Sequence, residues 1–209
     1  MKLNLKTISI ILFYGAIWGI VEASVGYVLH FLPTLIAGTI LFPFASIILY
    51  RTYQQTQSSA SLLGVGIVAA TIKAINFLLP VTNVFKIINP MISIILEALV
   101  VMVVVRSLVK SKWVMKVTLL TLASITWRVI FLGYMGIQAL TTGFVAQQIA
   151  SMNAMVSFAI VSGVLAGAMS FVLLLLLSIP AKLRKPVIQI SPILSMLTLS
   201  VAFVLTLIL

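Results

Sequence analysis

Residues 86–109 read KIINPMISIILEALVVMVVVRSLV, and this apolar stretch decides the fold. A helix needs about 20 mostly apolar residues, each rising about 1.5 Å, to cross a hydrocarbon core of about 30 Å. Six further stretches have the same character and predict an all-α, polytopic membrane helix bundle of six to seven transmembrane helices. Those stretches are residues 8–30, 34–50, 60–80, 114–137, 153–178 and 189–209. The second is the shortest and contains Pro43, so a kinked or partly re-entrant segment, leaving six full spans, stays open.

The composition excludes a soluble domain. Hydrophobic residues make up 63% of the 209 positions and charged residues 7%, whereas soluble domains are about 45–50% apolar and about 25% charged. We therefore predict one integral membrane domain over residues 1–209, with the lipid bilayer as its surroundings. The net charge of +11 does not indicate nucleic acid as a partner, because the basic residues cluster at the ends of apolar stretches.

The basic residues also predict the topology. Cytoplasmic connections of membrane proteins are enriched in Lys and Arg. The connections 30–34, 80–85 and 136–152 carry no Lys, Arg, Asp or Glu. This alternation predicts a multi-pass protein of the cell membrane with a cytoplasmic amino terminus, and an external loop or short interfacial helix over 140–152. The basic residues assigned to the cytoplasmic side are Lys2, Lys6, Arg51, Arg106, Lys110, Lys112, Lys116, Lys182, Arg184 and Lys185.

Polar residues inside the predicted spans indicate a functional site. Glu22 and Glu97 are the only acidic residues of the chain, and ionisable groups inside a membrane are costly enough to indicate function and to require partners. Lys73 and Arg128 are the basic candidates. Counting along the helices places all of these groups in the outer half of the bundle, and helical phase aligns them with further polar residues, which predicts a cavity. The predicted substrate-binding residues are Glu22, Lys73, Asn76, Asn89, Glu97, Arg128, Trp18 and Trp127, the two tryptophans as stacking surfaces for a planar ligand.

Other uses of the same charges stay open. Ion pairs such as Glu22 with Lys73 and Glu97 with Arg128 would lock the bundle of a structural subunit. A stand-alone proton- or ion-coupled carrier would titrate one of the glutamates. A chain with one His, no Cys and no Asp lacks the usual patterns for catalysis or for a metal site, so we predict neither an enzyme nor a cofactor.

The chain resembles the substrate-binding S components of energy-coupling factor (ECF) transporters. The resemblance consists of total size, an all-helical body of about six spans with the amino terminus inside, and a stripe of small residues in the first span, Gly15, Gly19 and Ala23. It implies that this stripe docks on a membrane scaffold subunit, which works with two ATPase subunits. It also implies an outer pocket, capped by external loops, for a small-molecule substrate. Because the predicted pocket charges nearly cancel, a vitamin, vitamin precursor or amino acid is the expected substrate.

Overall fold

All regular secondary structure in the described residues is helical, so the predicted all-α fold is confirmed. The structure is a computed structural model and describes residues 4–29, 34–80, 83–178 and 189–209, without the side chains of 34–37. The elements are α1 (Leu5–Leu29), α2 (Thr34–Thr56), α3 (Ala60–Ala74), η1 (Ile75–Leu78), α4 (Phe85–Lys110), α5 (Trp113–Thr142), η2 (Gln147–Ile149), α6 (Met152–Val156), η3 (Ser157–Val161), α7 (Ser162–Leu177) and α8 (Pro192–Ile208).

The helices match the seven predicted segments in order, but two of them are longer than predicted. The second segment, expected over 34–50, is a helix of 23 residues that contains Pro43 and continues to Thr56. The fifth continues to Thr142, where Gly143 ends it with a left-handed backbone (φ 72°) that glycine adopts at little cost. The predicted connection over 140–152 is therefore shorter, and it contains only the 3-10 turn η2 before α6 begins.

Five of the described helical segments are long and apolar enough to cross a membrane, and the chain is accordingly a multi-pass membrane-type bundle. These are Leu5–Leu29, Ala60–Leu78, Phe85–Lys110, Trp113–Thr142 and Met152–Leu177. α2 is not among the five, and α8 is an apolar helix of 17 residues. Which side of the membrane each end faces stays a prediction, and Lys2, His30, Lys182, Arg184 and Lys185 lie outside the described residues.

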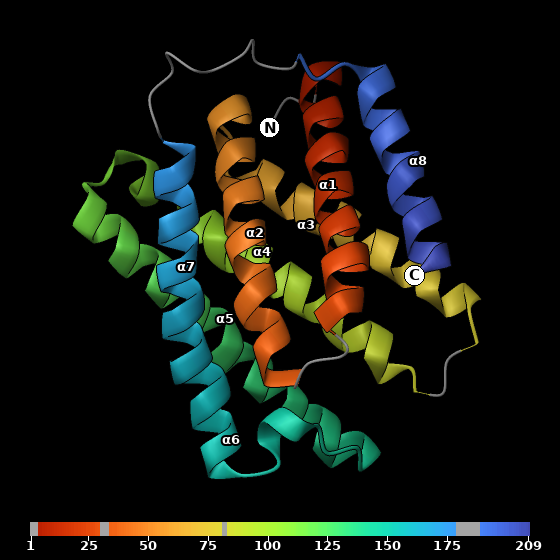
Figure 1. The fold of residues 1–209 in the computed structure, drawn as a ribbon, viewed down its shortest axis with the longest axis vertical. Helices are drawn as coiled ribbons and strands as arrows, with labels where there is room; N and C mark the ends of the chain where they lie inside the picture. The colour runs from red at the N-terminus through yellow and green to blue at the C-terminus, as the bar shows by residue number, and fades with distance from the viewer. Residues whose placement is uncertain (1–3, 30–33, 81–82, 179–188) are drawn as a thin grey trace.

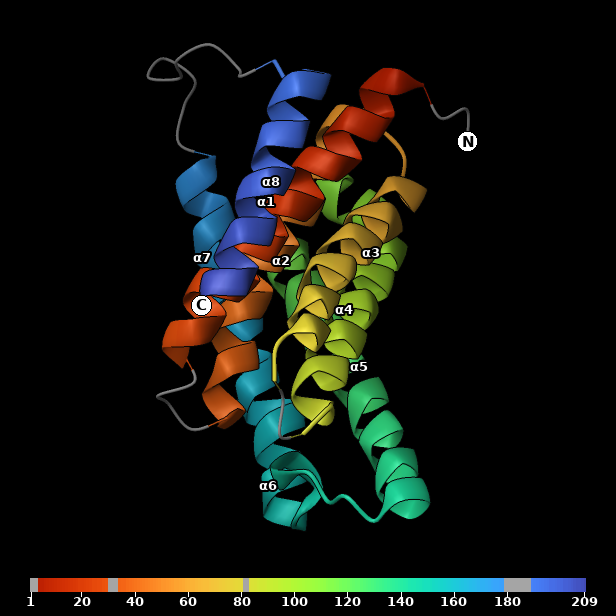
Figure 2. The same ribbon diagram turned by 90° about the vertical axis from the view of Figure 1, so that its right-hand side faces the viewer.

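Six helices enclose the interior, and α8 lies outside them. Neighbouring pairs follow the order α1, α3, α4, α5, α7 and α2, and α2 closes the ring by packing against α1. α8 packs against α1 at the edge of the bundle (Figures 1 and 2). A hydrogen bond of 2.8 Å from the Ser195 hydroxyl to the Ser9 carbonyl oxygen joins α8 to α1.

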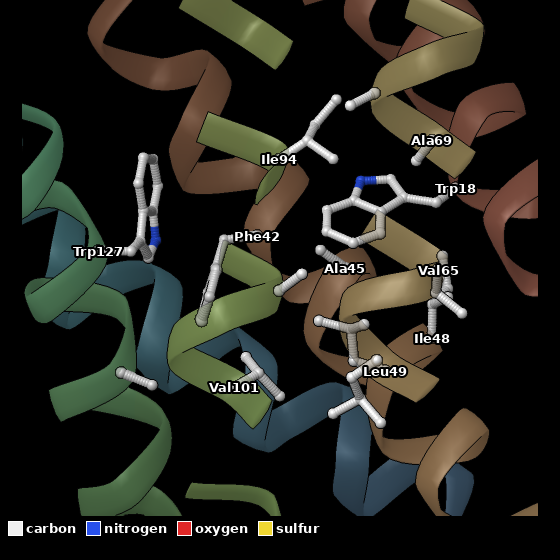
Figure 3. Packing of buried hydrophobic residues seen from close by; sticks show 14 of the residues in the cluster. Trp18, Phe42, Ala45, Ile48, Leu49, Val65, Ala69, Ile94, Val101 and Trp127 are labelled. Atoms are coloured by element: carbon white, nitrogen blue, oxygen red, sulfur yellow. The ribbon is translucent and has the colours of Figure 1, made fainter. Parts of the chain in front are cut away.

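The main hydrophobic core joins residues of α1, α2, α3, α4 and α5, together with Phe158 of η3 and Ala166 of α7. Figure 3 shows Trp18 next to Ala69 and Val65 of α3, with Ile94 of α4 close by. Trp18 is fully buried in this cluster.

Gly15 and Gly19 are packing residues inside the bundle. A Cβ atom on Gly15 would lie 2.5 Å from Cβ of Val68, and one on Gly19 would lie 2.7 Å from Cδ1 of Ile72. Such close approach of two backbones is the usual role of small residues between membrane helices. The partner-docking prediction for Gly15, Gly19 and Ala23 needs correction, because α3 covers the two glycines and Ala23 is also buried.

Candidate functional site

A cavity of about 420 Å³ lies at the end of the bundle where α1 ends and α4 begins. It is bounded by α1, α2, α3, α4, α5 and the segment from Phe144 to Phe158. This volume falls within the range of small-molecule sites. The lining side chains are Glu22, Leu29, Leu41, Lys73, Phe85, Lys86, Asn89, Pro90, Ser93, Glu97, Trp127, Phe131, Met135, Phe144, Ala146, Gln147, Gln148 and Phe158, together with Gly26 and Gly38.

α4 provides a polar stripe that runs from the mouth of the cavity to its floor. Lys86, Asn89, Ser93 and Glu97 recur at helical spacing and all line the cavity. Lys86 is exposed, Asn89 and Ser93 are half-buried, and Glu97 is only 3% exposed. Burial therefore increases along the stripe, which makes Lys86 a mouth residue and Glu97 a floor residue.

Glu22 reaches the same floor from α1. Its Oε1 accepts a hydrogen bond of 3.3 Å from Nε1 of Trp18, one helical turn earlier. Trp18 itself does not line the cavity, because its ring is packed in the core. The prediction that Trp18 stacks on a ligand is therefore wrong in this structure, and its role is to hold the Glu22 carboxylate.

Glu97 is buried without a complete set of partners. Its Oε2 has no hydrogen-bond partner in the described structure. The Glu97 carboxylate is close enough to Glu22 and Arg128 to interact with their charges, and the Glu22 carboxylate is close enough to Lys73 to interact with its charge. Neither glutamate forms a direct ion pair with a basic side chain among the described residues. The predicted pairs are thus electrostatic neighbours but not contact salt bridges, and a carboxylate oxygen is left for a ligand.

Aromatic side chains form the wall beside the two carboxylates. Trp127 lies 6.0 Å, centroid to centroid, from both Phe131 and Phe158, and all three line the cavity. The buried Nε1 of Trp127 has no hydrogen-bond partner in the described structure. A buried donor without an acceptor is costly, so a ligand acceptor at this position would be stabilised.

Sequence reasoning found Trp127 but missed its neighbours. Phe131 and Met135 follow Trp127 at intervals of four residues, so helical phase alone could have found them. Phe158 could not be found in this way, because it lies in the π-helical turn η3, whose wider hydrogen-bonding pattern interrupts the α-helical phase.

Arg128 lies behind the cavity wall and not in it, which corrects its prediction as a substrate-binding residue. The side chain is fully buried. Its guanidinium donates to the Ser124 carbonyl and hydroxyl oxygens and, over 2.8 Å, to the Gly38 carbonyl oxygen of α2. It also lies 4.5 Å from the Trp127 ring centroid. Arg128 therefore joins α5 to α2 and fixes Trp127 from behind.

The two predicted asparagines occupy different places. Oδ1 of Asn89 accepts hydrogen bonds of 3.1 Å from the Tyr134 hydroxyl and from Nε2 of Gln138, so its amide group is held at the cavity wall. Asn76 instead lines a second cavity, of about 310 Å³, which lies towards α8. The prediction that Asn76 belongs to the main site is not supported. Lys73 and Lys86 line both cavities.

The segment after α5 covers the mouth. The rings of Phe85 and Phe144 stack with their centroids 5.0 Å apart, which ties this segment to the start of α4. Gln147 and Gln148 complete the cover. The sequence indicated a covering segment here but gave no sign of the stacked pair, since the two residues are far apart in the chain.

The predicted site residues that meet in the cavity are thus Glu22, Lys73, Asn89, Glu97 and Trp127.

No protein-family model matches the chain, and comparison with curated proteins and with solved structures also gives no match.

Proposed function

We propose that this protein is a membrane-embedded substrate-binding subunit that captures a small nutrient, such as a vitamin, vitamin precursor or amino acid, from outside the cell. It would then pass the molecule to an ATP-driven transporter of the ECF type. The observation that carries the proposal is the cavity itself, in which buried hydrogen-bonding atoms of Glu97 and Trp127 have no partner among the described residues.

The position and lining of the cavity support uptake. The cavity is near the end of α1, away from its amino-terminal end, which the basic residues predict to be cytoplasmic. A few polar groups among aromatic walls are typical of sites that bind small organic molecules. The lining also balances two acidic residues against two lysines, which favours a ligand without a large net charge.

The ECF scaffold and its two ATPases remain our proposed partners. The lining residues offer no nucleophile paired with a base and no nucleotide-binding loop, so energy for transport would come from another subunit. Because α3 covers Gly15 and Gly19, the docking face would use other residues.

A stand-alone proton- or ion-coupled carrier is the second candidate. The observation that favours it is the presence of both glutamates in one cavity without contact salt bridges among the described residues. A carrier of this kind would accumulate its substrate in proteoliposomes without ATP or partner subunits, whereas a binding subunit alone would not.

Native mass spectrometry of the detergent-purified protein tests the binding function. Trp127→Phe is the informative variant, because it removes a buried donor that has no protein acceptor while keeping an aromatic ring. Trp113→Phe is the matched control, since Trp113 does not line either cavity and is 45% exposed.

We expect a bound species of a few hundred daltons in the wild type and in Trp113→Phe. Trp127→Phe should bind it about tenfold more weakly and remain folded, because removal of the unsatisfied donor offsets part of the packing that the smaller ring loses. An empty wild-type protein, also after incubation with a nutrient mixture, would contradict a binding role.

A further inference from the structure

We propose that the cavity selects a planar molecule with a cationic nitrogen, and that this nitrogen enters first, lying between Glu22 and Glu97 on the floor while an acidic group of the same molecule faces Lys86 at the mouth. This inference rests on the proposed binding function and adds the ligand's charge pattern and orientation. Suitable nitrogens are those of protonated amines and amidines, which carry both a positive charge and N–H donors.

Depth along the helices separates Lys86 from the acidic residues of the cavity. Lys86 and Glu97 are eleven residues apart on α4, which corresponds to about 16 Å along the axis. Glu22 lies seven residues before the end of α1, or about 10 Å from that end, and Lys73 lies five residues before the end of the helical span Ala60–Leu78, at a similar depth. The acidic side chains are therefore deep, and Lys86 is the basic residue at the mouth.

The floor is suited to a cation because, among the described residues, neither of its two carboxylates is in contact with a basic side chain. Arg128 directs its guanidinium to Ser124 and Gly38 and does not line the cavity. The Glu97 side chain is only 3% exposed. Its Oε2 has no hydrogen-bond partner in the described structure, so this oxygen requires a donor. A protonated ligand nitrogen that carries N–H would supply both the hydrogen bond and the charge.

The aromatic wall of the cavity also favours a planar cation. Trp127, Phe131 and Phe158 line the same cavity as the carboxylates, and the faces of such rings attract cations as well as planar apolar groups. A planar cation would therefore contact aromatic faces and carboxylates together. A purely anionic ligand would meet two carboxylates at this depth and would be repelled.

The mouth offers the opposite charge. Lys86 is exposed, and it also lines the neighbouring second cavity. Asn89 lies between mouth and floor. Its Oδ1 accepts hydrogen bonds from Tyr134 and Gln138 of α5, so its amide N–H group is left to donate to a ligand. An acidic group at the outer end of the ligand would meet Lys86, and a carbonyl in its middle would meet Asn89.

The test uses the full-length, detergent-purified protein and an equimolar mixture of the amino acids and the water-soluble vitamins, combined with a small-molecule extract of the producing cells. Compounds retained after rapid desalting are identified by mass spectrometry. The wild type is compared with Glu97→Gln, Lys86→Gln and the control Lys110→Gln, which changes an exposed lysine at the other end of α4. Thermal unfolding of each variant reports folding.

We expect the retained compounds to carry a cationic nitrogen. Glu97→Gln should lower their retention at least tenfold, Lys86→Gln should lower it only for compounds that also carry an acidic group, and Lys110→Gln should have no effect. Retention of anions without a cationic nitrogen, or unchanged retention in a folded Glu97→Gln, would overturn the charge pattern and leave the binding function standing. Retention of no compound by the wild type would contradict the binding function itself.

Discussion

Adding one methyl group at Gly19 should destabilise the bundle, because the structure uses this glycine to bring α1 against α3. The new Cβ would lie 2.7 Å from Cδ1, 3.0 Å from Cγ2 and 3.2 Å from Cβ of Ile72. Overpacking of this kind costs about 1–3 kcal/mol, while replacing a helical glycine by alanine recovers about 0.5–1 kcal/mol. We therefore expect Gly19→Ala to lower the free energy of unfolding by about 0.5–2 kcal/mol.

Gly133→Ala is the matched control, because no atom lies within 4 Å of the Cβ it would add to α5. It makes the same chemical change in a helix interior without a clash, so we expect it to be neutral or stabilising by up to about 1 kcal/mol. The difference between the two variants, about 1–3 kcal/mol, isolates the packing between α1 and α3.

Unfolding in mixed detergent micelles, followed by circular dichroism, measures both variants. Ile72→Ala removes Cδ1 and Cγ2 of the contacted side chain, so Gly19→Ala should cost at least about 1 kcal/mol less in that background. The reasoning is refuted if Gly19→Ala and Gly133→Ala have equal stability. Loss of a copurifying partner at unchanged stability would instead restore the docking role for Gly19.

Three further predictions concern topology, the support of the site and its cover. Because the chain has no Cys, a cysteine at exposed Gln147 should react with an impermeant maleimide on intact cells and one at Lys110 should not; the reverse pattern would invert the topology. Arg128→Lys should destabilise the protein by about 2–4 kcal/mol in micelle unfolding, since lysine cannot make all three hydrogen bonds; equal stability would remove its structural role. Phe144→Ala should speed ligand release several-fold in stopped-flow displacement by breaking the stack with Phe85; an unchanged rate would show that the stack does not retain ligand.

The helices were predictable because their signal is local. Long apolar runs and basic ends identify each segment without knowledge of its neighbours. The boundaries at Thr56 and Thr142 were missed because apolarity marks the membrane thickness and not the end of the helix, which in α5 is set by Gly143. Pro43 suggested an interruption, yet the helix continues through it.

The site was predictable only in part, because helical phase gives the face of a residue but not its neighbours. Depth and phase correctly grouped Glu22, Glu97 and Lys73. They also placed Arg128 in the cavity, although hydrogen bonds to Ser124 and Gly38 hold it behind the wall.

The glycine stripe shows the same limit. The resemblance assigned the stripe to an external scaffold subunit, because the sequence alone does not show which helix packs on it. In the structure Ile72 and Val68 of α3 occupy that face.

A cryo-electron microscopy map of the protein purified with its copurifying small molecules tests the central claim most directly. Our account predicts non-protein density in the cavity, in contact with the Glu97 carboxylate and the Nε1 atom of Trp127 and covered by Phe144. A cavity filled by repacked side chains, or by a lipid acyl chain that contacts neither polar atom, would contradict it.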